Sequence, residues 1–304
     1  MQMEQAMFGK LALSALALLL LGAAPAPLAD RPGASKDIAK ACGTRDGWAE
    51  PAPPAHIHGQ TWYVGTCGIT VVLVDTGAGL VLIDTGPQEA VPHVLASIRA
   101  LGFDPKRIRW ILSTHEHFDH VGGLAAMQRE TGADVVTGPF IGDALRSGRP
   151  FPDDPQAAEL AEKPMEPVKV TRTLRDNGSV FTSDPRFTAH ATPTHSPGST
   201  SWTWRSCDQD GCKTIAYADS NSTISSDGYR FSDNPRRISS ARYGLGRIAA
   251  MPCDILITPH PGSSNLLERL SGRGTLVDAG ACKAYAESGM KRLDQRLEKE
   301  GPAK

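Results

Sequence analysis

Six consecutive residues concentrate the chemistry-bearing side chains of this sequence. Residues 115–120 read His-Glu-His-Phe-Asp-His, which places three imidazoles and two carboxylates in one hexapeptide. Neutral imidazole and carboxylate are ligands that zinc prefers, but six adjacent positions cannot all ligate one tetrahedral ion with an open position. A spacing of two points His115 and His117 the same way from an extended segment. Asp119 and His120 then serve a second direction, so we expect two metal ions.

Each ion would need a further ligand from elsewhere in the chain. His195 and His260 both lie in Pro- and Gly-containing loops that follow extended segments, so both could reach the sheet edge that carries the hexapeptide. His93 lies on a predicted helix and is interpreted as a surface residue. His56 and His58, near the start of the mature chain, are interpreted as rim residues and not as ligands.

The hexapeptide is embedded in alternating strands and helices. It directly follows a short apolar run and precedes a Gly-Gly pair that lets backbone pack closely, which argues against an exposed histidine-rich loop without a function. Hydrophobic periodicity predicts strands at 70–75, 80–84, 108–112, 133–137 and 254–257, mostly strands between 168 and 218, and helices at 89–101, 121–131, 141–145, 234–250 and 280–300. The Pro- and Asp-rich segment 147–167 is predicted to be a surface loop with at most one helical turn. The pattern predicts an α/β fold in which two sheets are covered by helices.

The N-terminal segment is interpreted as a processing signal. The apolar run at 11–24 follows Lys10 and precedes a small-residue region, and it is shorter than the roughly 20 residues that a spanning helix needs. We therefore expect a secretory signal peptide at about 1–29, a single domain at 30–304 and a periplasmic protein; an uncleaved anchor is the alternative. We expect no membrane association after cleavage.

Charge and composition exclude several classes of protein. Lys and Arg together number 32 and Asp and Glu 33 in 304 residues, which gives a formal net charge of −1. That balance provides no basic surface for nucleic acid, so we expect no such partner. Hydrophobic residues at 40% and charged residues at 21% are ordinary for a globular chain with a core. No feature demands an oligomer, so we expect a monomer.

If the chain is exported as predicted, its six cysteines are expected to form disulfide bonds. They are Cys42, Cys67, Cys207, Cys212, Cys253 and Cys282, an even number in an oxidising compartment. Six cysteines allow many connectivities, and sequence alone does not choose among them. Cys207 and Cys212 flank an acidic, Gly-containing turn and are a local candidate pair; nearest-neighbour pairing would then leave Cys42–Cys67 and Cys253–Cys282. No Cys-x-x-Cys pair supports a zinc cluster.

These residues resemble the metallo-β-lactamase superfamily. Its His-x-His-x-Asp-His signature is met at 115–120 and its strand-ending Asp-Thr-Gly at 84–86, and the resemblance runs from about Trp62 to the terminal helix. Within the superfamily the chain looks like subclass B3, because of the segments at 194–200, 217–220, 227–231 and 258–262. The resemblance implies a four-layer αββα sandwich with a di-zinc site at one edge of the two sheets. It also implies three sequential disulfides.

The resemblance assigns roles residue by residue. His115, His117 and His195 should hold the first Zn²⁺, and Asp119, His120 and His260 the second. Ser220 and Ser222 match the serines with which subclass B3 members bind the substrate carboxylate. The second-site cysteine of subclass B1 is absent.

The implied activity is zinc-dependent hydrolysis of the β-lactam amide bond of penicillins, cephalosporins and carbapenems by a metal-bound hydroxide, and hence antibiotic resistance. Asp119 should both ligate the second ion and orient that hydroxide. The alternatives are another hydrolase of the same fold, such as a glyoxalase II-like thioesterase, a lactonase or a phosphodiesterase, and a periplasmic zinc-binding protein without turnover. The rival hydrolases typically bridge both metals with an Asp near Asp219, so the direction in which Asp219 points discriminates between them.

Overall fold

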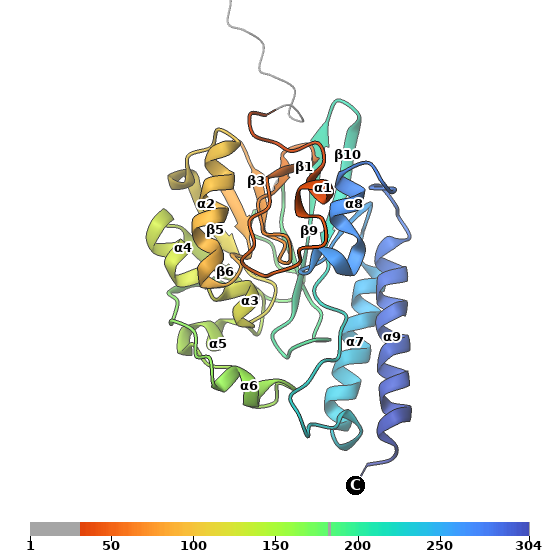
Figure 1. Ribbon diagram of the computed structural model, residues 1–304. Helices are drawn as coiled ribbons and strands as arrows, with labels where there is room; N and C mark the ends of the chain where they lie inside the picture. Colours follow the sequence, from red (N-terminus) through yellow and green to blue (C-terminus); the bar gives the residue numbers. More distant parts are fainter. Residues whose placement is uncertain (1–30, 182–183, 304) are drawn as a thin grey trace, which may run out of the picture.

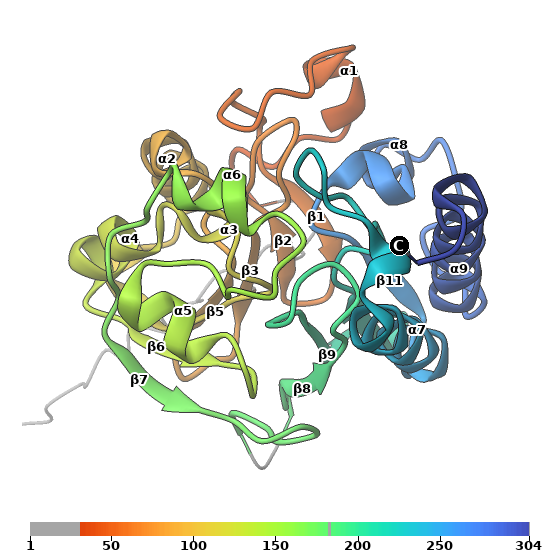
Figure 2. The same ribbon diagram turned by 90° about the horizontal axis from the view of Figure 1, so that it is seen from below.

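Two β-sheets pack face to face, and helices cover the outer face of each (Figures 1 and 2). The computed structural model describes residues 31–181 and 184–303, so the predicted signal peptide lies outside the described residues. Within them, no helix has both the length and the apolar composition that crossing a bilayer would require.

The first sheet carries the hexapeptide. In the described residues it has the order β1-β2-β3-β4-β5-β6-β7. Its strands are β1 (Ala55–His58), β2 (Thr61–Tyr63), β3 (Val72–Asp75), β4 (Leu80–Ile83), β5 (Ile108–Leu112), β6 (Asp134–Thr137) and β7 (Val170–Thr173). Pairing is antiparallel from β1 to β4 and parallel from β4 to β7.

The second sheet has the order β11-β10-β9-β8 in the described residues. Its strands are β8 (Thr188–Ala191), β9 (Thr200–Asp208), β10 (Gly211–Tyr217) and β11 (Ile255–Ile257). The strands β8, β9 and β10 pair antiparallel, and β11 joins β10 in parallel.

Helices form the two outer layers. The helices α2 (Val91–Ala100) and α4 (Leu124–Thr131) lie against the first sheet, and α7 (Pro235–Ala250) and α9 (Ala281–Glu300) lie side by side against the second (Figure 1). Shorter helices are α1 (Ile38–Cys42), α3 (Phe118–Val121), α5 (Gly142–Ser147), α6 (Ala157–Ala161) and α8 (Leu266–Leu270), and 3₁₀ turns lie at Gln88–Ala90, Pro105–Arg107, Phe231–Asp233 and Pro261–Ser264.

Alternation along the strands of the first sheet separates two cores. Val72 and Val74 of β3 point into the core between the sheets, whereas Leu73 points into the core beneath α2 and α4. Because successive side chains of a strand face opposite ways, a strand that is apolar at every position must be covered on both faces. A separate apolar cluster lies between the second sheet and α7 and α9. The αββα sandwich is therefore confirmed.

Most predicted elements are present, and the exceptions are informative. The strand β5 has the predicted bounds, and the hairpin turn between Cys207 and Cys212 joins β9 to β10. The helix predicted at 121–131 is present as α4, but its predicted start is wrong, because Gly122-Gly123 separates α4 from α3, which ends at Val121. The backbone N–H of Gly123 donates to Gly86 O at 2.9 Å, and a Cβ at Gly123 would lie 2.5 Å from Val91 Cγ2. The glycine pair thus lets the Asp-Thr-Gly loop press against the hexapeptide.

The prediction for 147–167 is correct only in part. The segment contains α6, and much of it is half-buried or exposed. Asp154, however, is only 3% exposed and Leu160 only 8%. The segment is therefore not purely a surface loop, because it turns a carboxylate inward toward the hexapeptide.

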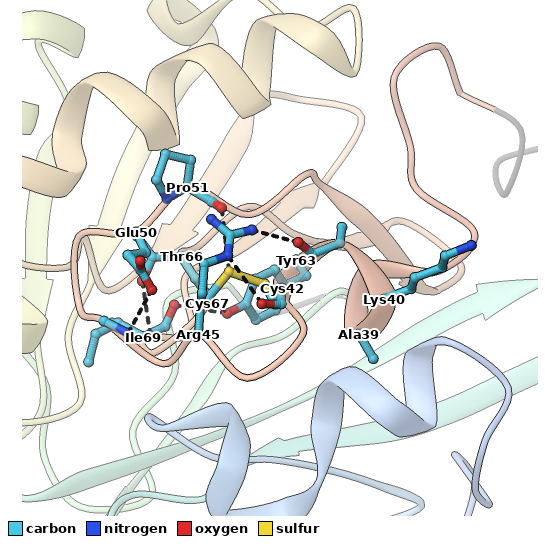
Figure 3. The surroundings of a disulfide bond; sticks show 12 residues. Ala39, Lys40, Cys42, Arg45, Glu50, Pro51, Tyr63, Thr66, Cys67 and Ile69 are labelled. Carbon is cyan, nitrogen blue, oxygen red and sulfur yellow. Dashed lines mark hydrogen bonds between the residues drawn. A yellow bond between two sulfur atoms is a disulfide. The ribbon is translucent and has the colours of Figure 1, made fainter.

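The six cysteines pair in sequential order, as the resemblance implied. Cys42–Cys67 ties the N-terminal segment to the β2–β3 loop (Figure 3), Cys207–Cys212 closes the β9–β10 hairpin, and Cys253–Cys282 ties the segment before β11 to the first turn of α9. Figure 3 also shows Arg45, Thr66 and Tyr63 gathered around the first bridge. No cysteine in the described residues is free.

Candidate metal centre

Loops at the carboxyl ends of three strands converge on one point. His115 and His117 follow β5, His195 follows β8, and His260 follows β11. Both sheets contribute, so residues far apart in the chain meet at a common edge. The hexapeptide supplies the remaining groups as it turns from an extended segment into α3, which begins directly after His117.

His115, His117 and His195 form the first group. One candidate ligand atom from each lies within 4.8 Å of the others. His117 Nδ1 lies 3.1 Å from His195 Nε2. The three side chains are nearly inaccessible, with at most 7% exposure. This is the set that the resemblance implies for the first ion.

Asp119, His120 and His260 form the second group. Asp119 Oδ2 lies 3.1 Å from His120 Nε2 and 3.3 Å from His260 Nε2. The triad of converging ligand atoms at this side consists of His115, Asp119 and His120, and it does not include His260. The His260 side chain is 34% exposed whereas that of His120 is buried, so the second group lies at the open side of the centre.

The outer nitrogen of four of the histidines has a partner. His115 Nδ1 meets Asp219 Oδ1 at 2.8 Å, His117 Nε2 meets Asp154 Oδ2 at 2.9 Å, His195 Nδ1 meets Ser222 Oγ at 2.9 Å, and His260 Nδ1 meets Gly68 O at 3.2 Å. Metal-binding histidines characteristically donate the second ring N–H in this way, which fixes the tautomer and the ring orientation. The inner nitrogens are thereby left with their lone pairs facing one another.

The inner atoms are suited to a cation. Within the described residues, His115 Nε2 and both ring nitrogens of His120 are buried without a hydrogen-bond partner, although Asp119 lies close to His120 Nε2. Unsatisfied buried polar atoms are costly and rare in native proteins. A divalent cation would satisfy them, and a set of five imidazoles and one carboxylate fits Zn²⁺.

The protonation states also favour a cation. Burial lowers the pKa of His115 and His195 well below 6.5, and the charges of neighbouring histidines add to this effect. Burial alone would raise the pKa of Asp119, but the charge of the adjacent His120 holds it well below its ordinary value. The centre therefore presents neutral imidazoles at His115 and His195 and an ionised carboxylate at Asp119, the forms that ligate metal. The pKa of His117 and that of His120 are raised instead, because the neighbouring carboxylates of Asp154 and Asp119 outweigh the effect of burial.

The Asp-Thr-Gly loop after β4 supports the second group from behind. Asp84 has a φ of 60°, and its carboxylate accepts hydrogen bonds from Thr114 N at 2.8 Å and Tyr217 Oη at 3.0 Å. Burial raises the pKa of Asp84 to about 6. The backbone N–H groups of Thr85 and Gly86 donate to the carbonyl of His120 at 3.0 and 3.1 Å, which holds the end of the hexapeptide in place.

The remaining sequence-predicted residues lie around the two groups. Asp219 is fully buried and belongs to neither convergent group; it accepts from the outer nitrogen of His115. Ser222 contacts His195, and Ser220 is 6% exposed beside Asp219. Glu116 points away and accepts from Ser196 Oγ at 2.8 Å.

Two contacts were missed from sequence. Asp154 lies in the segment read as a surface loop, and the carbonyl of Gly68 carries no side-chain signal at all. The acidic character of 153–154 was the available hint for the first, but nothing in the sequence pairs that segment with His117.

The open side of the centre adjoins a hollow of about 390 Å³, lined by Trp48, Gly68, His260 and Ser263 among others. Trp48 is 43% exposed, and its ring lies 5.4 Å from that of Phe118 and 6.2 Å from that of His260. The hollow offers an approach for a small molecule beside the second group, with an aromatic wall on one side.

Comparison with known proteins agrees with this geometry. A family model described as the metallo-β-lactamase superfamily matches residues 64–208. The metallo-β-lactamase MIM-1 of Novosphingobium pentaromativorans is 52% identical, with a TM-score of 0.85 over 88% of this chain and 98% of that chain. SMB-1 is 39% identical, with a TM-score of 0.79 over 84% of this chain and 100% of that one. MEM-A1, a subclass B3 enzyme from a soil metagenome library, is 37% identical, with a TM-score of 0.79 over 84% of this chain and 98% of that chain.

A second type of relative matches a shorter part. Hydroxyacylglutathione hydrolase of Anaeromyxobacter dehalogenans is 43% identical over 89 residues, which are 29% of this chain and 31% of that enzyme. The match thus spans about a third of the length of this curated relative.

Proposed function

The chain belongs to the metallo-β-lactamase superfamily and is a hydrolase of its subclass B3, and from this premise we propose that it opens the β-lactam amide bond of penicillins, cephalosporins and carbapenems. The observation that carries the proposal is the position of Asp219, which pairs with the outer nitrogen of His115 and takes no part in either convergent group. A thioesterase of the glyoxalase II type would be expected to place an aspartate between the metals.

The proposed cofactor is a pair of Zn²⁺ ions. His115, His117 and His195 would hold the first, because their candidate ligand atoms converge. Asp119, His120 and His260 would hold the second, because Nε2 of each of the two histidines lies within 3.3 Å of Asp119 Oδ2. When bound, the ions would supply Lewis acidity, which activates water and polarises the amide carbonyl.

The chain's own residues would then position water and substrate. Asp119 Oδ2 lies between His120 and His260, and as an ionised carboxylate it would accept a hydrogen bond from the attacking water and so orient it. Ser220 and Ser222, of which Ser222 contacts His195 of the first group, would bind the substrate carboxylate. Because Ser222 Oγ already contacts His195, we assign the larger share of that binding to Ser220.

The proposed setting of the enzyme is the periplasm. We propose that residues 1–29 are cleaved as a signal peptide and that 30–304 form one domain, which acts as a monomer. Three disulfides are typical of an oxidising compartment. N-terminal sequencing and the hydrodynamic mass of the protein recovered from a periplasmic fraction test these points, and increased resistance of the expressing cells tests the proposed role in antibiotic resistance.

A substrate panel tests the proposed activity. Initial rates on a penicillin, a cephalosporin and a carbapenem would be measured beside a glutathione thioester and a homoserine lactone. We expect turnover of the β-lactams to exceed that of the other two by orders of magnitude. Preferential thioester hydrolysis would favour the glyoxalase-like alternative, and zinc binding without any turnover would favour a storage protein.

A further inference from the structure

The turn at 153–156 sends a buried carboxylate into the metal centre from a distant part of the chain. Asp154 is 3% exposed, whereas its neighbour Asp153 is exposed. Asp154 Oδ2 lies 2.9 Å from His117 Nε2, and its other oxygen, Oδ1, accepts the backbone N–H of Gln156 at 2.7 Å. Both oxygens of this carboxylate are therefore occupied, one by a proposed metal ligand and one by its own turn.

His117 differs from the other histidines of the first group in the nitrogen that faces inward. His115 and His195 have partners on Nδ1, which leaves Nε2 for a metal. His117 instead has its partner on Nε2, and its Nδ1 lies 3.1 Å from His195 Nε2. If His117 binds a metal through Nδ1, its Nε2 carries the hydrogen and needs an acceptor. Asp154, in the turn at 153–156, supplies that acceptor.

We propose that Asp154 is a positioning residue for the first metal ion: its carboxylate holds the hydrogen of His117 on Nε2 and thereby presents the Nδ1 lone pair to the ion. This rests on the ligand set given under Proposed function. A carboxylate that accepts from the outer nitrogen fixes the tautomer and orientation of a ligating imidazole, and loss of such a partner typically weakens metal binding by about 10- to 100-fold.

The same carboxylate holds a second group at the centre. By accepting the N–H of Gln156, Asp154 fixes the turn that carries the Gln156 side chain. The Gln156 amide nitrogen lies 3.4 Å from both His117 Nδ1 and His195 Nε2. An effect of Asp154 on the metal could therefore act through His117 or through Gln156, and the two routes require separate variants.

Metal affinity distinguishes these routes. In a His260→Ala background, which weakens the second group, Zn²⁺ affinity of the full mature chain would be measured by competition with a chromophoric chelator. We expect Asp154→Ala to weaken binding by about 10- to 100-fold and Asp154→Asn, which keeps an acceptor oxygen, to weaken it less. Gln156→Ala and the matched control Asp153→Ala should change the affinity by less than about threefold.

A second readout needs no metal. Nitrogen-15 NMR of the metal-free chain should find His117 protonated on Nε2, and Asp154→Ala should convert it to a mixture of tautomers. If Asp154→Ala fails to fold, the Zn²⁺ affinity of Asp154→Asn tests the proposal instead. The melting temperature of Asp154→Asn then serves as the control for folding. Equal affinities of the Asp154 and Asp153 variants, or a loss reproduced by Gln156→Ala, would overturn the proposal. If the Asp154 variants lose Zn²⁺ affinity as expected but the chain hydrolyses no β-lactam, the proposal about Asp154 holds and the proposed function is wrong.

Discussion

The carboxylate of Asp219 lies 2.8 Å from Nδ1 of His115, the outer nitrogen of a proposed ligand, and Asp219 belongs to neither triad of converging ligand atoms among the described residues. His115 Nε2, at the other end of the ring, is buried without a hydrogen-bond partner among the described residues. The pair therefore reads as an orienting contact. This contact supports the proposed β-lactamase activity over that of a thioesterase, although Asp219 adjoins Ser220 in sequence.

Asp119 is the residue on which the proposed two-metal chemistry depends most. Replacing Asp119 with Ala removes the anionic ligand of the second group while the three histidines of the first remain. We expect kcat to fall by roughly 100-fold or more, the scale seen when one preorganised electrostatic stabiliser is lost. Turnover and zinc content would be measured together. Near-normal turnover with one bound zinc would mean that the second ion is dispensable.

The Cys42–Cys67 bridge should influence the second metal. It anchors the loop that carries Thr66 and Cys67 (Figure 3). The Gly68 carbonyl of this loop accepts from His260 Nδ1 at 3.2 Å, and Thr66 Oγ1 donates to Trp48 O at 2.8 Å. We expect the double substitution Cys42→Ser/Cys67→Ser to weaken the second zinc about tenfold, as measured by chelator competition.

The matched control for this substitution is Cys253→Ser/Cys282→Ser. That bridge closes a similar length of chain, with a sequence separation of 29 against 25, but it lies before β11 whereas His260 lies after it. Both variants should lose about 2–4 kcal/mol of stability. Equal zinc affinities in the two variants would contradict this prediction, because the Cys42–Cys67 bridge would then stabilise the fold without affecting the second metal.

The two serines should behave differently. Ser220→Ala removes a proposed substrate contact and should raise KM several-fold with little change in kcat, as expected for uniform binding. Ser222→Ala also removes the hydrogen bond to His195 Nδ1, but the Ser222 carbonyl at 3.2 Å remains as an acceptor. We therefore expect a modest loss of first-site zinc affinity in that variant alone. A collapse of kcat in Ser220→Ala would reveal a chemical role for that hydroxyl.

What the sequence could predict was set by local patterns. The spacing of residues 115–120 predicts candidate ligands, and the apolar run of β5 predicts the strand that they follow. The positions of His195 and His260 near the hexapeptide could be predicted because each follows an extended segment. Loops that follow such segments tend to lie at the same edge of a sheet. The partners of the outer ring nitrogens of these histidines could not be predicted in this way.

The contacts that sequence could not predict join distant segments. Asp154 and Asp219 meet their histidines across 37 and 104 residues, and no periodicity encodes such a pairing. Strands β1 and β2 were also not predicted. The break between α3 and α4 depends on the close approach of Gly123 to Gly86, which is a tertiary requirement.

His190 on β8 should make stability depend on pH. Burial, assisted by the charge of Arg247, lowers the pKa of His190 from 6.5 to about 4. His190 of the unfolded chain then binds a proton more readily than that of the folded chain. The contribution to the free energy of unfolding is therefore complete above about pH 6.5 and falls by up to about 3 kcal/mol as the pH drops toward 4. His190→Gln should flatten this dependence in urea unfolding of the metal-free chain. An unchanged slope in that window would contradict the assignment.

The central claim is that two bound metal ions make this chain a β-lactam hydrolase, and zinc titration of the metal-free enzyme tests it most directly. Zn²⁺ would be added stepwise while bound metal and hydrolysis of the cephalosporin nitrocefin are measured on the same sample. We predict no turnover without metal, restoration as about two ions bind per chain, and loss of at least one ion in His115→Ala/His195→Ala. Turnover that persists after complete removal of metal, or an unchanged stoichiometry in the double variant, would contradict the account.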